Sequence, residues 1–121
     1  MPSFVLTAKE TDDVRSVMTD AMSALHDLLA SNVLDARKAD IAGRTLAGCA
    51  DAAKMLGTGG SCALSGDQGR ALQAPLLILA SATALLSEAR PPNGSAHRLL
   101  ALQAKATELG FLLDNRIELG H

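Results

Sequence analysis

The chain has 121 residues and a formal net charge of −2 at neutral pH; 48% of its residues are hydrophobic and only 2% are aromatic. This length fits one domain, and the small negative charge excludes a broad basic surface for a nucleic-acid backbone. Ala and Leu supply most of the apolar residues, and both favour helices. The composition therefore predicts a single all-α domain over residues 1–121, and its charge disfavours nucleic-acid binding.

The first part of the chain predicts a short extended segment, Ser3 to Leu6, and then a helical hairpin over residues 11–57. Thr11 is a candidate cap for a helix that runs to about Ser31, with Asn32 at its end. Apolar residues recur in alternating steps of four and three along one stripe of this helix. They are Val14, Met18, Ala21, Leu25 and Leu28.

The second helix of this hairpin is predicted to follow Asp35, which has a side chain suited to an N-terminal cap. It reaches Leu56 and ends at Gly57, a residue that favours the left-handed conformation after a helix. Its apolar stripe consists of Ala42, Leu46, Cys49, Ala53 and Leu56.

Residues 57–66 contain four of the ten glycines and predict an irregular connector between the two halves of the chain. A second hairpin is expected over residues 67–119. Its first helix begins at Asp67 or later and ends near Arg90, and Pro75 either kinks this helix or marks its first turn. Its second helix begins at Ser95 and fades after Ile117. The sequence thus predicts about four helices, arranged as two hairpins in a bundle-like domain.

The helix expected over residues 67–90 is apolar on nearly all sides, because only Ser81 and Thr83 interrupt its apolar residues between Ala74 and Leu86. One chain could bury this helix at its centre, but three other helices offer little cover for it. We therefore expect surplus apolar surface that serves a homodimer or a protein partner. The predicted contact residues are Leu76, Leu77, Leu79, Leu86 and Leu100.

No combination of side chains predicts a catalytic, metal or cofactor site. The three histidines, His26, His97 and His121, have no metal-ligand or triad neighbour at helical spacing. Cys49 falls on a core stripe, and Cys62 follows the glycines without a nearby cation to stabilise a thiolate. The run from Gly57 to Ser61 lacks the preceding strand and the following Lys of a phosphate-binding loop.

The sequence also predicts a cytoplasmic protein that does not cross a membrane. It starts without the basic and then apolar pattern of an export signal, and two cysteines are too few for a disulfide framework. The longest uncharged stretch, Ala71 to Ser87, is shorter and more polar than the roughly 18 to 20 apolar residues of a membrane helix.

Two stretches resemble small helical proteins of known groups. The stretch from Ala30 to Leu56, a turn followed by an Ala-rich helix, is similar to short helical proteins of phages and prophages. The stretch from Pro75 to Arg116 is similar to small helical proteins of pseudomonads, among them quorum-sensing antiactivators. This resemblance implies a regulatory or inhibitory protein that sequesters a transcriptional regulator, as antiactivators do on LuxR-type receptors.

Two other functions remain open on the sequence. A helix, a turn and a second helix carrying Arg37, Lys38 and Arg44 suggest a DNA-binding helix-turn-helix, although three aspartates dilute its charge. The opening Met1-Pro2, followed by an extended segment and a helix, resembles tautomerases. That resemblance implies a small enzyme that uses Pro2, but it covers only about a quarter of the chain, because a helix is predicted where the tautomerase fold needs strands.

Overall fold

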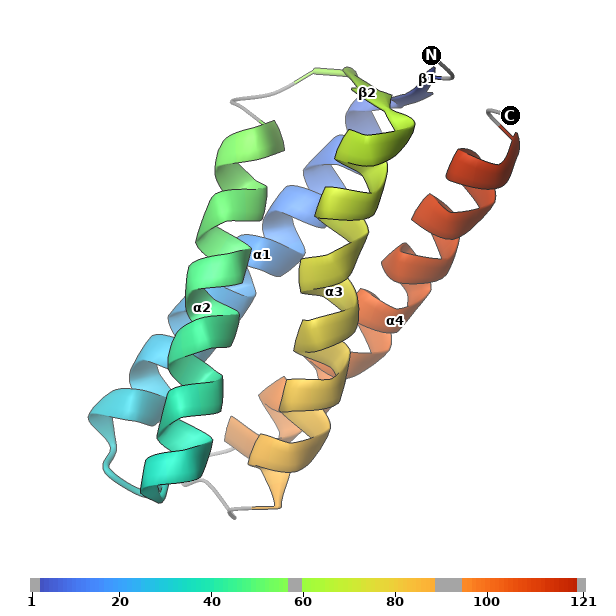
Figure 1. Ribbon diagram of the computed structural model, residues 1–121. Helices are drawn as coiled ribbons and strands as arrows, with labels where there is room; N and C mark the ends of the chain where they lie inside the picture. The colour runs from blue at the N-terminus through green and yellow to red at the C-terminus, as the bar shows by residue number, and fades with distance from the viewer. Residues whose placement is uncertain (1–2, 57–59, 89–94, 120–121) are drawn as a thin grey trace.

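A computed structural model describes residues 3–56, 60–88 and 95–119 and places four helices in two layers (Figure 1). Helices α2 and α3 form one layer, and α1 and α4 lie behind them. The elements are β1 (Ser3–Leu6), α1 (Ala8–Ala30), α2 (Ala36–Leu56), β2 (Cys62–Ser65), α3 (Gly66–Ser87) and α4 (Ser95–Leu119). The predicted all-α fold with a short extended N-terminal segment is confirmed.

The start of α1 differs from the expected one, because Thr7 and not Thr11 caps this helix. The backbone N–H of Glu10 donates to Thr7 Oγ1 at 3.1 Å, and the backbone N–H of Thr7 donates to Glu10 Oε1 at 2.9 Å. This reciprocal pair is a capping box, which satisfies two backbone donors at once. Thr11 instead lies inside the helix and is fully buried. The prediction placed the start one turn too late.

The turn between α1 and α2 follows the sequence prediction. Asn32 adopts a φ of 59°, a left-handed conformation that Asn tolerates better than most residues and that ends the helical path. Asp35 then accepts a hydrogen bond from the backbone N–H of Lys38 at 2.8 Å, as an N-terminal cap does. The expected stop at Gly57 lies outside the described residues.

The connector predicted over residues 57–66 is not irregular throughout, because β2 lies within it. This strand pairs antiparallel with β1, with Phe4 opposite Leu64 and Leu6 opposite Cys62. Phe4, Leu6 and Leu64 are buried in the core, which explains why so short a strand forms there. The sheet joins the start of the chain to the segment between the two hairpins. Ser65 also caps α3 in a second capping box, with Gln68.

The two predicted hairpins form, with α1 packed on α2 and α3 packed on α4, and α2 on α3 is the next most extensive pairing. The predicted stripe of α1 is buried, and so are Leu99, Leu102, Ala106, Leu109 and Leu113 of α4. On α2, Leu46 and Ala53 are only half-buried, at the edge of the core. Pro75 lies inside a continuous α3, so it does not begin the helix. Helix α3 ends at Ser87, three residues before the predicted end at Arg90. Arg90 itself lies outside the described residues.

Three ion pairs tie α4 to earlier elements, and one of them joins Arg98 to Asp27 of α1 at 3.4 Å. Arg116 donates to Glu10 Oε2 at 2.6 Å and joins the end of α4 to the first turn of α1. Arg70 of α3 donates to Asp114 Oδ1 at 2.9 Å and to Gln73 Oε1 at 2.9 Å, while Gln73 donates to the backbone oxygen of Gly110 at 3.2 Å. These contacts set the position of α4 along α3.

Gly69 of α3 is the tightest of the glycine positions that the structure describes. A Cβ atom there would lie 2.6 Å from Phe4 Cε1 and 3.0 Å from Ile117 Cγ1, so α3 approaches both β1 and α4 closely at this point. Gly43 of α2 offers the contrast, because a Cβ atom there would have nothing within 4 Å.

We predict that Gly69→Ala lowers the free energy of unfolding by about 1–2 kcal/mol, because overpacking against the Phe4 ring outweighs the better helix propensity of Ala. Gly43→Ala, the matched control, should raise it by up to about 1 kcal/mol. Urea denaturation followed by circular dichroism measures both values. Equal effects of the two substitutions would contradict the close packing at Gly69.

Candidate docking surface

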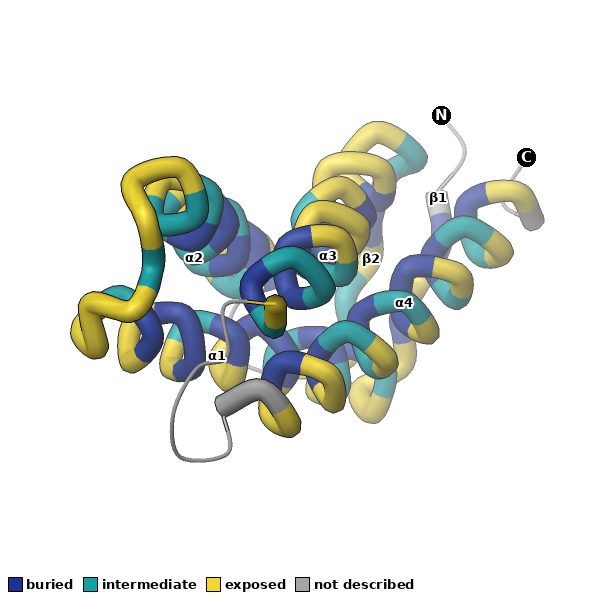
Figure 2. Tube along the Cα trace, turned by 90° about the horizontal axis from the view of Figure 1, so that it is seen from below, coloured by how far each residue is buried: buried dark blue, intermediate teal, exposed yellow. Residues whose placement is uncertain are grey.

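Helix α3 divides its apolar residues between the core and the outside of the molecule. Its inner side packs on the other helices, and Figure 2 shows its opposite side exposed along much of its length. The inner residues are Leu72, Leu76, Leu79, Ala82, Thr83 and Leu86, all buried. A single copy of the chain therefore buries one side of this helix and leaves the other side exposed to solvent.

This division corrects three of the predicted contact residues. Leu76, Leu79 and Leu86 have no exposed surface in a single chain, so they belong to its core and are not available to a partner. Their spacing of three and seven places them on one side of the helix, and α3 packs on α4 and α2. The apolar residues alone could not indicate which side of an all-apolar helix would face inward.

The other two predicted contact residues are exposed but lie apart. Leu77 of α3 is 48% exposed and Leu100 of α4 is 51% exposed. Leu77 packs over Gly110, where a Cβ atom would lie 3.2 Å from Leu77 Cδ2. Gly110 is ten residues beyond Leu100, or about 15 Å along α4. The two leucines therefore do not form one surface.

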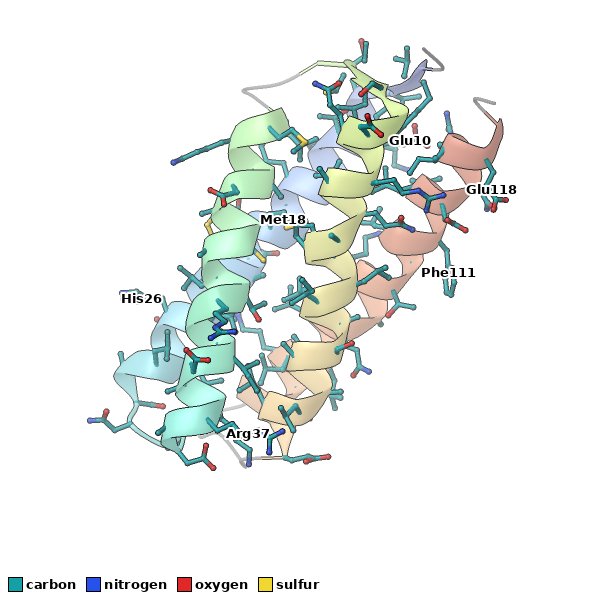
Figure 3. The ribbon with its side chains drawn as sticks, in the orientation of Figure 1. Glu10, Met18, His26, Arg37, Phe111 and Glu118 are labelled. Carbon is teal, nitrogen blue, oxygen red and sulfur yellow. The ribbon has the colours of Figure 1, made fainter. Side chains whose placement is uncertain are left out.

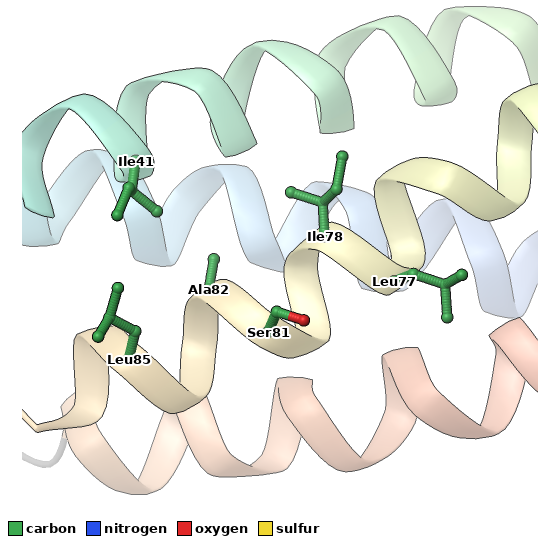
Figure 4. Close-up of a pocket in the computed structure, with 6 residues that line it drawn as sticks. All are labelled: Ile41, Leu77, Ile78, Ser81, Ala82 and Leu85. Atoms are coloured by element: carbon green, nitrogen blue, oxygen red, sulfur yellow. The ribbon is translucent and has the colours of Figure 1, made fainter.

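An apolar groove runs between α2 and α3 on the outer side of their layer. One part of it is lined by Ile41 of α2 and by Leu77, Ile78, Ser81, Ala82 and Leu85 of α3. Figure 4 shows Ile41 and Ile78 pointing into the space between the two helices. The groove continues past Ile78 along residues that include Ala71 and Ala74 of α3 and Gly48, Ala52 and Met55 of α2. We call these two adjoining hollows, which share Ile78, the α2–α3 groove.

The groove gathers exposed apolar side chains that are otherwise scattered. Of the large hydrophobic residues exposed in the described part of the chain, Met55, Leu77 and Ile78 line it. The other four are single residues elsewhere: Val5 on β1, Val33 in the turn before α2, and Leu100 and Phe111 on α4. Phe111 is shown at the outer side of α4 in Figure 3. The sequence prediction missed Ile78, Ile41 and Met55.

The α3 wall of the groove carries no charge. Every residue from Ala71 to Ser87 is uncharged, although five of them are exposed. By contrast, the exposed residues of α1 include Lys9, Asp12, Asp20 and Asp27. The α2 wall is charged only at its rim, where Arg44 pairs with Asp40 at 3.1 Å and Asp51 lies further along. The floor of the groove thus favours an apolar occupant over an ionic one.

The side chains that could take part in catalysis or bind a metal do not lie together in one site. His26 and His97 are exposed on different helices, and His121 lies outside the described residues. Within the described ranges, no group of three or more His, Cys, Asp or Glu side chains could hold a metal ion. A second hollow between α1 and α4 is lined by Asp20, Arg98 and Lys105, of which Arg98 pairs with Asp27 and Lys105 with Glu108. Both basic residues of this hollow are therefore paired with carboxylates at the surface.

The residues behind the two alternative functions are placed as follows. Arg37, labelled in Figure 3, is exposed at the start of α2, whereas Arg44 is held by Asp40. The basic residues of α2 therefore do not form a continuous positive stripe. Pro2 lies outside the described residues, and the strand after it pairs only with β2, in a two-stranded sheet. An all-helical chain of this kind offers no positive indication of catalysis.

Helix α3 contains the uncharged stretch from Ala71 to Ser87 and begins five residues before it. It extends from Gly66 to Ser87 and is, among the described helices, the one that is long and apolar enough to cross a membrane. Core helices of soluble proteins pass the same test of length and composition, and α3 packs on α2 and α4 here. Length and composition alone therefore do not assign it to a membrane.

Comparisons of the chain with protein-family models, with curated proteins and with solved structures found no match. The proposal about function below therefore rests on the shape of the α2–α3 groove and on its apolar lining.

The two cysteines differ in their surroundings, which leads to a prediction about their reactivity. Cys49 is fully buried in α2, and burial raises the pKa of its thiol from 9.0 to about 11, because the core disfavours the thiolate. Cys62 is half-buried at the start of β2. We predict that at pH 8 a thiol reagent modifies one cysteine per native chain, at Cys62.

Cys49 should react at that pH only after denaturant is added, and its native reactivity should not rise until the pH approaches 11. Mass spectrometry of the modified peptides distinguishes the two sites. Modification of Cys49 in the folded chain at pH 8 would contradict the placement of its side chain in the core.

Proposed function

We propose that this chain is a non-catalytic regulatory module that binds an apolar α-helix of another protein in the α2–α3 groove. The observation that carries this proposal is the outward side of α3, where Leu77 and Ile78 are 48% and 55% exposed on a stretch of helix without any charge. Exposed contiguous apolar surface of this kind marks interaction sites in soluble proteins.

The shape of the groove favours a helix as its occupant. Its walls are two helices, and its lining side chains recur along α3 at positions 71, 74, 78, 81 and 85. An amphipathic helix laid between them would insert its own apolar residues at the same spacing, as in other helix-in-groove complexes. Small residues on both walls, Ala74 of α3 and Gly48 of α2, allow the close approach that such packing needs.

Binding of this kind gives regulation by sequestration. A protein that uses an amphipathic helix to dimerise or to contact its own target loses that function when the helix lies in the α2–α3 groove. A transcriptional regulator that dimerises through a helix is a partner of this class, in keeping with the resemblance to antiactivators. The expected site residues are Ile41, Leu77, Ile78 and Leu85.

The proposal is tested by placing a photoreactive amino acid at position 81, because Ser81 is exposed and lines the groove. Irradiation in cells of the native host should cross-link this position to an apolar helix of another protein. The same label at Ser16, exposed on α1, serves as the control and should not give that product. Ile78→Asp should reduce the cross-link at position 81 at least about tenfold, because a charge cannot be buried there without a partner.

Purified partner and chain should then bind in isothermal titration, with the same sensitivity to Ile78→Asp. The proposal fails if position 81 cross-links only to other copies of this chain, or to nothing. It also fails if the product survives Ile78→Asp unchanged while circular dichroism shows that the variant is folded.

A further inference from the structure

The exposed side of α3 has the spacing of a helix-pairing surface. Its residues alternate in steps of three and four, which is the heptad repeat that keeps one side of a helix facing a second helix. We call these residues the outward stripe. They are Ala71, Ala74, Ile78, Ser81 and Leu85, of which the first four are exposed and Leu85 is half-buried.

We propose that the helix that occupies this face when the chain is alone is α3 of a second copy, packed antiparallel on the outward stripe. This inference rests on the proposed function, because it assigns an occupant to the same groove. A two-fold interface uses the same patch on both copies, so the patch must be complementary to itself. The outward stripe meets that condition in three ways. It carries no charge, its small and large side chains can pair across the two copies, and the residues that flank it have opposite charges.

The lack of charge restricts what can cover the stripe. Any helix that buries Ile78 must itself be free of unpaired charge along about 25 Å, the length of the uncharged segment from Ala71 to Ser87. On the exposed sides of α1 and α2, charged residues recur at intervals of a few residues. Among the described helices, the run from Ala71 to Ser87 of α3 is the longest without a charge; in α4, charged residues recur at Arg98, Lys105, Glu108 and Asp114.

The side-chain volumes favour the antiparallel orientation. In an antiparallel pair the two kinds of heptad position face each other. In the register that we propose, Ala74 lies opposite Leu85 of the second copy, and Ile78 lies opposite Ser81 of the second copy. Each layer then pairs a small side chain with a large one, which fills space evenly. A parallel pair would instead place Ala74 on Ala74 and Ser81 on Ser81, which leaves these two layers underfilled.

The charges that flank the stripe favour the same orientation. Arg70 precedes it and Glu88 follows it, and both residues are exposed. The antiparallel register brings Arg70 of one copy within about one residue of Glu88 of the other at each end of the interface. A parallel register would oppose like charges at both ends. Within one copy, Arg70 pairs with Asp114 of α4 at 2.9 Å, and it is not among the residues that line the groove. Antiparallel helix dipoles add to the preference.

The area of such an interface indicates how strong it can be. A single pair of helices with support from Ile41 and Met55 of α2 is at the small end of specific interfaces, below about 1,200 Å² in total. We therefore expect a dissociation constant in the micromolar range, and a dimer that a tighter-binding partner helix can displace. Self-association and partner binding would then compete for the same face.

Sedimentation equilibrium of the purified full chain tests the dimer. The wild-type chain should shift from one to two copies between about 5 μM and 500 μM. Ile78→Asp should weaken this association at least about tenfold, whereas Phe111→Asp, which alters an apolar residue of α4 that is 66% exposed, should leave it unchanged. Ala74→Leu, a substitution of an exposed residue, should also weaken it by crowding Leu85 of the second copy. Circular dichroism confirms that each variant is folded.

Orientation is tested by cross-linking in a Cys49→Ala, Cys62→Ser background. A mixture of Ala74→Cys and Leu85→Cys chains should form a mixed disulfide dimer, because these positions face each other. Ala74→Cys alone should not cross-link, since the two copies of that position lie about 16 Å apart along the axis and a disulfide needs Cα atoms within about 7 Å.

A wild-type chain that stays monomeric at 500 μM would overturn the inference, and so would self-association that Ile78→Asp leaves unchanged. Efficient cross-linking of Ala74→Cys with itself would overturn the antiparallel orientation. None of these results affects the proposed partner helix, which is decided by the cross-link at position 81. Conversely, a dimer without any cross-linked partner would leave this inference standing and remove the proposed function.

Discussion

The packing of the inner side of α3 against α4 and α2 is the interaction on which the rest of the structure depends. Leu72, Leu76, Leu79 and Leu86 are fully buried there, and among the described residues no other helix has as many large aliphatic side chains without exposed surface. Each such side chain contributes about 1.5–3 kcal/mol when removed from water. This packing fixes the rotation of α3 about its axis, and that rotation decides which residues face outward. The α2–α3 groove is therefore a consequence of how the core is filled.

The same rotation gives α3 two roles that ordinary surface helices do not combine. Its inner side needs no partner beyond its own chain, while its outer side exposes Ile78 and Leu77 without a charged residue between positions 71 and 87. Exposed aliphatic surface weakens solubility and is driven towards burial by the same hydrophobic effect that forms the core. A docked helix, from a partner or from a second copy, would remove this surface from water.

The sequence predicted the fold well where local signals are strong. The stripes of α1 and α4 follow from apolar spacing, and Asp35 and Asn32 act as the cap and the helix end that their side chains favour. Strand β2 could not be predicted in this way, because four residues form it only through pairing with β1 at the far end of the sequence. The start of α1 was misplaced because Thr11 competed with Thr7, and only the pairing of Thr7 with Glu10 distinguishes them.

The docking surface was predicted only in outline. The surplus apolar residues of α3 indicated that some of them face outward, but Leu76, Leu79 and Leu86 proved to be core residues. An all-apolar helix has almost no amphipathic signal to set its rotation. Small and polar residues do not mark the outward stripe either, because Ala82 and Thr83 are buried in the core while Ala74 and Ser81 are exposed. The α2 wall could not be inferred without the packing of α2 on α3.

The most direct test of this account measures how exposed the δ1 methyl group of Ile78 is to water as the protein concentration rises. Nuclear magnetic resonance with a soluble paramagnetic probe gives this exposure methyl by methyl, and the ring protons of Phe111, on the outer side of α4, serve as a reference. The account predicts that Ile78 is open to the probe in dilute solution and becomes protected at high concentration, while Phe111 stays exposed. Protection of Ile78 at every dilution, or undiminished exposure of both residues at the highest concentration, would contradict it.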